Sequence, residues 1–283
     1  MKKLVAIALL LSLLTPFSVL AVFNTQSALL ASASTQYFTR ADTASLSITG
    51  NVTAEAWVKF TTLPSAGSAA QIVGKFDSAS AARSWRLEYD NGNSSPGNAL
   101  AMYGDLLGDN TVNVYGYTSW TPSTGVWYHV AGVLTVGATP TVALYIDGVS
   151  QSITYTAQLG VTAIFDGNNN TALGALNTGG TPALFLNGRL SLVRVWSEAR
   201  SGANISANMC NVLGSTTNLA AEWTLDNTLN DNSGNANTLT NVNTVTFGTD
   251  IPSACVPPPQ GNESKKFQDA NIRIINGNFR IID

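Results

Sequence analysis

The 283-residue sequence carries little charge. Only 11% of its residues are Asp, Glu, Lys or Arg, whereas about a quarter is usual in soluble domains. The net charge is −3, and the sequence has no basic stripe that could neutralise a row of phosphates. Composition therefore argues against a nucleic-acid partner and against a polybasic membrane-binding patch. A neutral surface rich in Asn, Thr, Ser and Gly suits an extracellular β-protein better than a cytosolic enzyme.

Histidine and cysteine are also scarce. The chain has one histidine, His129, and two cysteines, Cys210 and Cys255, which is too few for the usual four-ligand zinc sites. In an exported chain an even number of cysteines is typical of disulfides, so we predict a Cys210–Cys255 bridge. Two unrelated free thiols are the alternative.

Long apolar runs are absent beyond the N-terminus. Residues 1–21 combine two lysines, an apolar stretch over 4–14 and a small residue at Ala21. This order is typical of a secretory signal peptide cut after Ala21, although a membrane anchor is the alternative. We therefore expect a secreted protein, extracellular, periplasmic or at the cell surface, with no membrane span in the mature chain.

Helix signals are rare: one short helix is predicted over 201–210, with Ser201 as its N-cap. The rest consists of short β-like runs separated by Gly, Pro, Asn, Asp and Ser. Apolar alternation is clear over 53–60, 85–89, 127–134 and 184–196, and a shorter strand is predicted over 46–48. Many short strands predict an all-β antiparallel β-sandwich, a jelly roll, over residues 22–250.

Two Asx-Gly pairs predict tight turns. Asp147-Gly148 follows the apolar run 142–146, and Asn187-Gly188 precedes a long alternating strand. Glycine accepts a positive φ without a Cβ clash, so both pairs favour a hairpin turn.

The chain continues past the predicted sandwich. Residues 251–262 contain four prolines and predict a semi-rigid linker. Within 263–283, two Ile-rich runs flank Asn276-Gly277 and predict a C-terminal β-hairpin extension. A lone hairpin is marginally stable, so we expect self- or partner association through residues Ile272–Ile282. A frayed tail is the alternative.

Four segments resemble the laminin-G-like jelly-roll domains of the concanavalin A-like lectin/glucanase superfamily. The segments are Gln36–Phe38 with Thr53–Val58, Gly125–Gly132 with Leu144–Gly148, Phe185–Arg189 with Val193–Trp196, and Leu219–Trp223 with Asp231–Asn235. The resemblance covers residues 36–247 and leaves out the C-terminal hairpin. It implies the jelly-roll fold, but it does not identify a ligand.

Hydrolases of this superfamily use paired carboxylates that share one face of a strand. We find no complete Glu-x-Asp-x-Glu motif and take Glu222 and Asp226 as the nearest pair. His129 lies mid-strand among aromatic and apolar residues, which favours packing over base catalysis, and no nucleophile elbow is present. We therefore predict that the protein is not an enzyme, with a cryptic glycoside hydrolase as the alternative.

Calcium is the one cofactor that the sequence suggests. Resembling domains often bind this ion, and one Gly-containing loop region supplies the hard oxygen ligands that calcium prefers. The candidate ligands are Asp226, Asp231, Asn232, Ser233 and Asn235. A turn that uses Asn and Asp for backbone reasons is the alternative.

The predicted function is that of a secreted, non-catalytic binding or adhesion module. It would recognise a glycan or an extracellular protein through loops at one rim of the sandwich. Candidate ligand-binding residues are Trp120, which could stack on a sugar ring, and Asp166, Asn168 and Asn169 in a polar loop. A structural subunit that uses its C-terminal hairpin for strand addition is the alternative.

Overall fold

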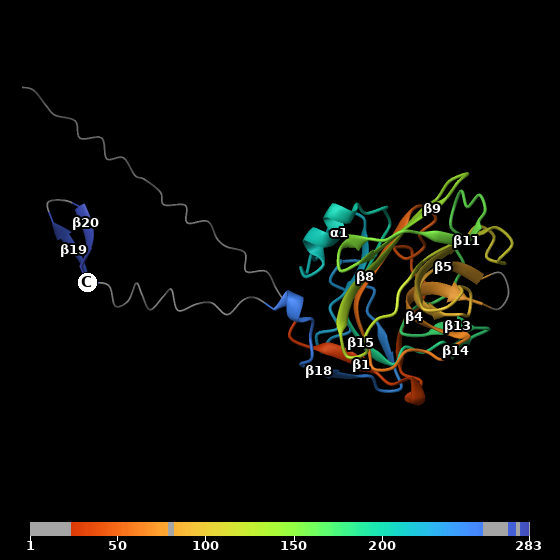
Figure 1. The fold of residues 1–283 in the computed structure, drawn as a ribbon, viewed down its shortest axis with the longest axis horizontal. Helices are drawn as coiled ribbons and strands as arrows, with labels where there is room; N and C mark the ends of the chain where they lie inside the picture. The colour runs from red at the N-terminus through yellow and green to blue at the C-terminus, as the bar shows by residue number, and fades with distance from the viewer. Residues whose placement is uncertain (1–23, 79–81, 257–270, 276–277, 283) are drawn as a thin grey trace, which may run out of the picture.

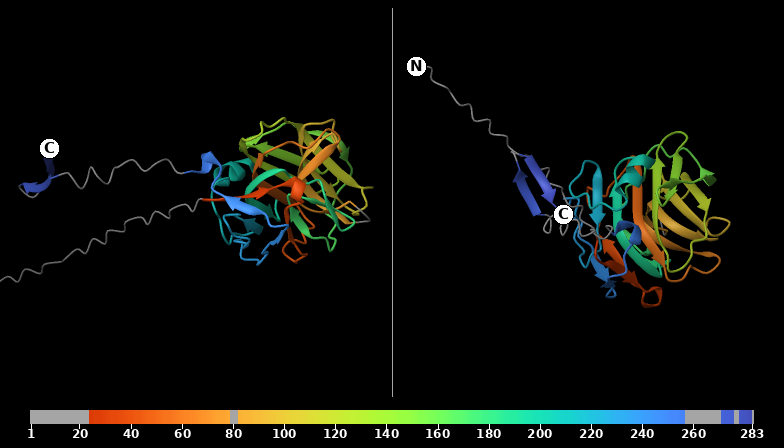
Figure 2. Two further views of the ribbon diagram at one scale, coloured as in Figure 1. Left: turned by 90° about the horizontal axis from the view of Figure 1, so that it is seen from below. Right: turned by 60° about the vertical axis from the view of Figure 1, so that its left-hand side comes forward.

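The computed structural model describes residues 24–78, 82–256, 271–275 and 278–282. Between Ser27 and Gly248 the chain forms two β-sheets that pack face to face (Figures 1 and 2). Among the described residues the strand pairs are antiparallel except that of β13 (Leu176–Thr178) with β4 (Ser68–Asp77), where Asn177 meets Asp77, and an isolated parallel bridge joins Ser68 to Gly92. The predicted all-β sandwich is therefore confirmed.

The first sheet contains eight strands among the described residues. Their order is β10 (Val149–Ser150), β9 (Thr141–Ile146), β8 (Trp127–Thr135), β3 (Val52–Phe60), β15 (Gly188–Trp196), β1 (Ser27–Leu30) and β18 (Thr246–Gly248), and β16 (Leu219–Trp223) pairs with β15.

The second sheet contains ten strands in the same part of the chain. Their order is β11 (Thr154–Gln158), β7 (Asn113–Ser119), β6 (Ala99–Asp105), β5 (Ala82–Asn91), β4 (Ser68–Asp77), β12 (Thr171–Leu173), β2 (Tyr37–Arg40) and β17 (Thr240–Val242). A small hairpin, β13 (Leu176–Thr178) and β14 (Thr181–Ala183), joins the sheet through β4.

The main core fills the space between the sheets. Strands alternate their side chains between two faces, so every second residue of β3 and β5 points into this space. Phe60 on β3 and Tyr89 on β5 meet there, with ring centroids 5.2 Å apart. Their intervening neighbours point to the outer faces, which are themselves largely buried.

The predicted turn at Asp147-Gly148 is confirmed. Both residues have positive φ, 50° and 75°, and the strands on either side pair as β9 and β10. The predicted turn at Asn187-Gly188 is wrong, because Gly188 is the first residue of β15. A Cβ on Gly188 would lie 2.1 Å from the Lys59 carbonyl oxygen, so glycine serves close strand approach there.

The predicted strand over 46–48 is also absent. Leu46 is fully buried, but its backbone amide donates to the Thr43 carbonyl 2.9 Å away, which closes a turn. The apolar pattern over 46–48 therefore predicted buried side chains correctly, but the strand that it predicted is a turn.

A short cap covers the outer face of the first sheet. It contains α1 (Gly202–Asn208) and the following loop to Gly214, and Ser201 caps α1 by accepting from the Asn204 amide at 3.2 Å. The predicted Cys210–Cys255 disulfide is present and links this loop to the 3₁₀ turn η2 (Ser253–Cys255).

Buried charges hold the cap to the sheet. The Arg194 guanidinium contacts Glu55 at 3.1 Å and Glu222 at 2.9 Å, and it also donates to the carbonyl of Asn208 in the cap. Burial raises the pKa of Glu55, but the Arg194 charge and the hydrogen bonds of His129 and Trp196 outweigh it and lower that pKa to about 2.

The C-terminal strands form a two-stranded sheet of their own. β19 (Asn271–Ile275) and β20 (Asn278–Ile282) pair antiparallel with each other. Residues 1–23, most of the predicted linker and the predicted Asn276-Gly277 turn lie outside the described residues, so the signal peptide and the complete hairpin stay predictions. No helix among the described residues is long and apolar enough to span a membrane.

Candidate functional site

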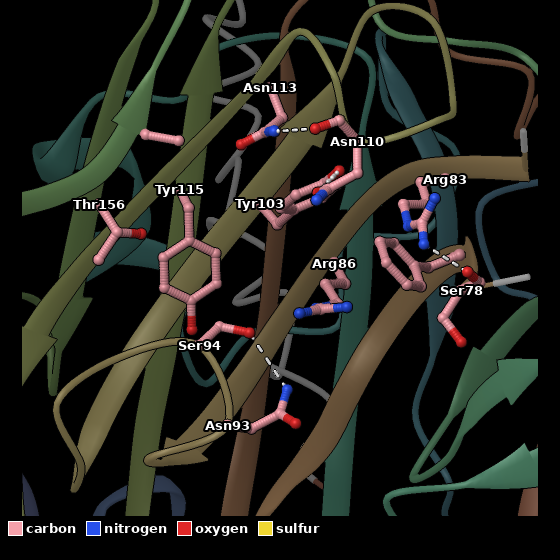
Figure 3. A pocket seen from close by; sticks show the side chains of 12 residues that line it. Ser78, Arg83, Arg86, Asn93, Ser94, Tyr103, Asn110, Asn113, Tyr115 and Thr156 are labelled. Atoms are coloured by element: carbon pink, nitrogen blue, oxygen red, sulfur yellow. Dashed lines mark hydrogen bonds between the residues drawn. The ribbon is translucent and has the colours of Figure 1, made fainter.

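A pocket of about 370 Å³ opens on the outer face of the second sheet (Figure 3). Its walls come from β4, β5, β6, β7 and β11 and from the loops that follow β5 and β6. The lining residues are Phe76, Ser78, Arg83, Arg86, Asn93, Ser94, Tyr103, Asn110, Asn113, Tyr115, Thr156 and Ala157.

Strand alternation places the aromatic and charged side chains in this pocket. Trp85, Leu87 and Tyr89 of β5 point to the core, so Arg86 and Glu88 between them point to the outer face. On the neighbouring strands Tyr103 pairs directly with Tyr115, with ring centroids 6.4 Å apart. The second sheet therefore carries a row of functional side chains across three adjacent strands.

Arg86 lies at the centre of the pocket, and only 6% of it is exposed. Its guanidinium carbon lies 4.2 Å from the centre of the Phe76 ring and 5.2 Å from that of Tyr103. Gly74 makes room for this arrangement, because a Cβ there would lie 2.7 Å from the Arg86 Cβ. One guanidinium nitrogen, Nη2, binds Glu88 at 2.9 Å, whereas the buried Nε has no hydrogen-bond partner.

Two carboxylates lie beneath the pocket floor. Glu88 and Asp90 are both fully buried, and the Tyr115 hydroxyl donates to Asp90 at 2.7 Å and to Glu88 at 3.3 Å. Burial raises the pKa of Glu88, and the nearby Asp90 charge raises it further against the lowering effect of Arg86. Burial and the same two carboxylates raise the pKa of Tyr115.

A buried aspartate shapes each of the two loops that border the pocket. Asp90 at the end of β5 accepts from the amides of Gly92, Asn93 and Ser94 at 2.7–2.8 Å. These bonds bend the loop so that its polar side chains lie at the pocket edge, as in an Asx turn.

Asp105 at the end of β6 does the same for the next loop. It accepts from the amides of Leu107, Gly108 and Asn110 at 2.7–2.9 Å, and from the Tyr103 hydroxyl. Asn113 extends this edge, because its side-chain amide donates to the Asn110 carbonyl at 2.8 Å (Figure 3). The pocket rim is therefore preformed by backbone hydrogen bonds.

The family model described as the concanavalin A-like lectin/glucanases superfamily matches residues 32–206, more than half of the chain. The chain belongs to this superfamily. The resemblance seen in the sequence motifs is thus confirmed. No curated protein matches the sequence.

Two solved structures have a similar fold. One is a candidate carbohydrate binding protein from Bacteroides ovatus, with 19% identity and a TM-score of 0.61 over 83% of this chain and 63% of that protein. The other is a heptameric SAP-like pentraxin from Limulus polyphemus, with 15% identity and a TM-score of 0.53 over 82% of this chain and 97% of the pentraxin. At these identities the likeness shows the fold alone, and the chain spans less than two thirds of the Bacteroides protein.

The choice of Glu222 and Asp226 as the nearest carboxylate pair was wrong. Glu88 and Asp90 are only two residues apart and share the outer face of β5, as a glucanase-like pair would. Glu222 instead binds Arg194, and Asp226 accepts from the Thr25 hydroxyl at 2.9 Å. The alternation of 85–89 already contained the signal, because residues two apart on a strand share a face.

The structure places Trp120 away from the predicted polar loop. It is partly buried, and its ring meets those of Phe60, Tyr89 and Tyr128 edge-on at 6.2, 6.0 and 5.2 Å. These contacts occupy the indole at the margin of the main core. A sugar-stacking role for Trp120 remains a prediction.

The polar loop at 166–170 lies beside the pocket but does not line it. Asp166 binds the buried Lys75 at 2.6 Å, and Asn169 donates to the Ala82 carbonyl. The neighbouring Phe165 amide donates to the Asp105 carbonyl at 2.7 Å, which fixes the loop near the pocket rim. Asn168 is exposed. A ligand contact by these residues remains a prediction.

Protein donors occupy the two predicted carboxylate ligands of calcium, Asp226 and Asp231. The Asp231 carboxylate accepts from the amides of Glu222, Ser233 and Asn237 and from the Ser233 hydroxyl. The Asn235 side chain donates to the Leu219 carbonyl at 2.9 Å. The backbone amide of Asn232 donates to the Glu222 carbonyl at 2.8 Å.

Such bonding is what an Asx-rich turn makes for backbone reasons. Within the described residues no group of three or more His, Cys, Asp or Glu lies together in a metal-binding arrangement. Calcium would have to displace these protein donors from Asp231, and calcium binding at this loop remains a prediction.

Proposed function

We propose that this protein is a non-catalytic glycan-binding module whose binding site is the pocket on the outer face of the second sheet. The supporting observation is the chemistry of the pocket lining. It combines three aromatic rings with amide and hydroxyl side chains on a preformed rim. The fold adds weight, because the superfamily contains lectins.

A sugar ring needs both kinds of group. Its C–H faces are apolar and pack on aromatic rings, while its hydroxyls both donate and accept hydrogen bonds. Asn93, Asn110 and Asn113 supply amides that do both, and Ser94 and Thr156 supply hydroxyls. The cavity volume of about 370 Å³ lies within the usual range for small ligands.

A catalytic role is the less favoured alternative, although the superfamily also includes glucanases. A retaining glycosidase needs two carboxyl groups about 5–5.5 Å apart that both reach the scissile bond. Glu88 and Asp90 are fully buried, and Asp90 already accepts four hydrogen bonds. Neither carboxylate is available to a substrate in this arrangement.

Export is part of the proposal. The Cys210–Cys255 disulfide indicates an oxidising environment, such as the periplasm or the cell exterior. A module of this kind would meet glycans on a surface or in a matrix outside the cell.

Assembly through the C-terminal strands is a second proposed role. β19 and β20 pair with each other, and a two-stranded sheet is marginal on its own. Deleting residues 263–283 should leave glycan binding unchanged. If the deletion abolishes glycan binding while the sandwich still melts normally, the C-terminal segment is part of the binding machinery and this division of roles is wrong.

The decisive experiment is a glycan array with the full secreted chain, followed by calorimetry on the best ligand. Thr156 is exposed at the pocket edge, so Thr156→Trp should fill the entrance without disturbing the core. Thr141→Trp is a matched control at an exposed position of β9 in the first sheet. We expect loss of binding for the first variant only. Equal binding by both variants would place the site elsewhere.

A further inference from the structure

The charge lining the pocket is entirely positive. Arg83 and Arg86 both line it, whereas no Asp or Glu is among its lining residues. The nearby carboxylates of Glu88, Asp90 and Asp105 are each fully buried below the floor, and the exposed Asp109 on the loop after β6 is not among the described residues that line the pocket. A ligand in the pocket would therefore meet two guanidinium groups and no carboxylate.

The buried aspartates are already compensated by other groups. Each of Asp90 and Asp105 accepts three backbone amides and one tyrosine hydroxyl. Hydrogen bonds of this kind spread the negative charge over the surrounding dipoles. Only Glu88 pairs with a pocket arginine, and it does so through a single contact to Nη2 of Arg86.

Arg86 retains unused donor capacity that is costly to leave unpaired. Its Nε is buried without a hydrogen-bond partner, although more than nine tenths of the residue is buried. The rings of Phe76 and Tyr103 hold the guanidinium in place. The Arg86 side chain lines the pocket as a planar, preorganised guanidinium, and such a group is well suited to carboxylate and sulfate groups.

Arg83 adds a second cation at the rim. Its backbone amide donates to the Gly108 carbonyl at 3.0 Å, and its side chain donates to the Ser78 carbonyl (Figure 3). Neither partner carries a charge. The exposed Asp109, whose pKa is lowered mainly by hydrogen bonds from Thr111 and further by the Arg83 charge, is the carboxylate that partly balances Arg83 at the pocket edge.

We infer that the pocket selects an anionic saccharide, with Arg86 and Arg83 binding a carboxylate or sulfate group carried by the sugar. This inference rests on the proposed glycan-binding function and specifies its ligand class. The aromatic rings and amides hold the ring and its hydroxyls, while the two arginines discriminate in favour of the charged form.

Matched probes test the inference with the full secreted chain. One pair is an oligouronate and the same oligosaccharide after reduction of its carboxylates to alcohols. The other is a sulfated oligosaccharide and its desulfated form. We expect calorimetry to show binding about tenfold tighter or more for the charged member of one pair, and that pair identifies the anionic group. Raising NaCl from about 0.05 M to about 0.5 M should weaken that binding.

Two variants separate the arginines from general charge. Arg83→Gln should reduce the preference for the charged probe, and Arg86→Lys should do so more strongly because it removes the planar fork but keeps a partner for Glu88. Arg189→Gln removes the same charge on the first sheet, where Arg189 pairs with Asp250, and should leave the preference unchanged.

The outcomes distinguish the two proposals. If neutral probes bind as tightly as charged ones and Arg83→Gln changes nothing, the anionic specificity is wrong while glycan binding stands. If no probe of either kind binds and the array is blank, the glycan-binding proposal itself fails. A preference that Arg189→Gln removes as effectively as Arg83→Gln would also overturn the inference, because it would reflect net charge alone.

Discussion

Acid should weaken the attachment of the cap through one carboxylate, Glu55. This side chain is buried between the first sheet and the cap, and its pKa is about 2 instead of the ordinary 4.5. Because the pKa in the folded protein is lower than in the unfolded chain, ionised Glu55 stabilises the fold fully above about pH 4.5. That stabilisation is lost as the pH falls from 4.5 to about 2.

The expected magnitude follows from the difference between the two pKa values. At about 1.4 kcal/mol per pKa unit, Glu55 contributes about 3 kcal/mol to the free energy of unfolding at neutral pH. Removing one partner of a buried ion pair costs about 3–5 kcal/mol in other proteins, so Glu55→Gln should lose a similar amount. The variant should also lose the pH dependence that Glu55 supplies.

The assay is urea denaturation followed by tryptophan fluorescence at a series of pH values between about 2 and 7. Trp57 packs against His129, which lies 3.4 Å from Glu55, and Trp196 donates to Glu55 through its indole nitrogen, so both fluorophores report on this carboxylate. Glu198→Gln is the control, because Glu198 is about one third exposed and pairs with Arg200 at the surface of the same region. Parallel stability curves for wild type and Glu55→Gln between pH 4.5 and 2 would refute the reasoning.

Three further predictions concern stability. Gly188→Ala should lower the free energy of unfolding by about 1–3 kcal/mol, because the new Cβ would clash with the Lys59 carbonyl. Gly50→Ala is the control and should have a far smaller effect, because no atom lies within 4 Å of its Cβ position. Equal denaturation midpoints for the two variants would contradict this. Replacing Cys210 and Cys255 together by Ser should lower the free energy of unfolding by about 3–4 kcal/mol, and two alkylatable thiols in the secreted wild type would contradict the bridge. Calcium binding at Asp226 and Asp231 remains a prediction. If the ion binds there, it should raise the melting temperature of the wild type, and Asp231→Asn should abolish that increase. Identical melting curves with and without a chelator would rule out calcium binding.

Local chemistry predicted those parts of the fold that depend on neighbours in the sequence. Asp147-Gly148 forms its turn because the positive φ values are a property of those two residues. Asn187-Gly188 has nearly the same chemistry, yet position 188 needs glycine because a Cβ there would clash with the carbonyl of Lys59, a residue more than a hundred positions away. Sequence pattern alone could not distinguish these two reasons for a glycine.

The pocket was harder to predict for the same reason. The alternation over 85–89 shows that Arg86 and Glu88 share a face, but not that the face is covered by loops or borders Tyr103 and Tyr115. Those contacts depend on the order of β5, β6 and β7 in the sheet and on the bend that Asp90 imposes on the next loop. The residue pattern favours the Asn-rich loops as the binding site, whereas the folded chain brings aromatic, amide and guanidinium groups together on a strand face.

The disulfide also determines how the domain would respond to a mechanical pull. Asn24 and Cys255, which lie near the first and last described residues of the sandwich domain, line the same small pocket. In Figure 1, η2 lies on the left of the sandwich, whereas β4, β5 and β11, which contribute to the glycan pocket, lie on the right. The disulfide gives a pull on Val256 a covalent path from Cys255 to Cys210 that bypasses the intervening β16, β17 and β18. Arg194 then transfers that tension to the sheet. A module held at this end could resist shear while its pocket, on the far side, keeps its shape.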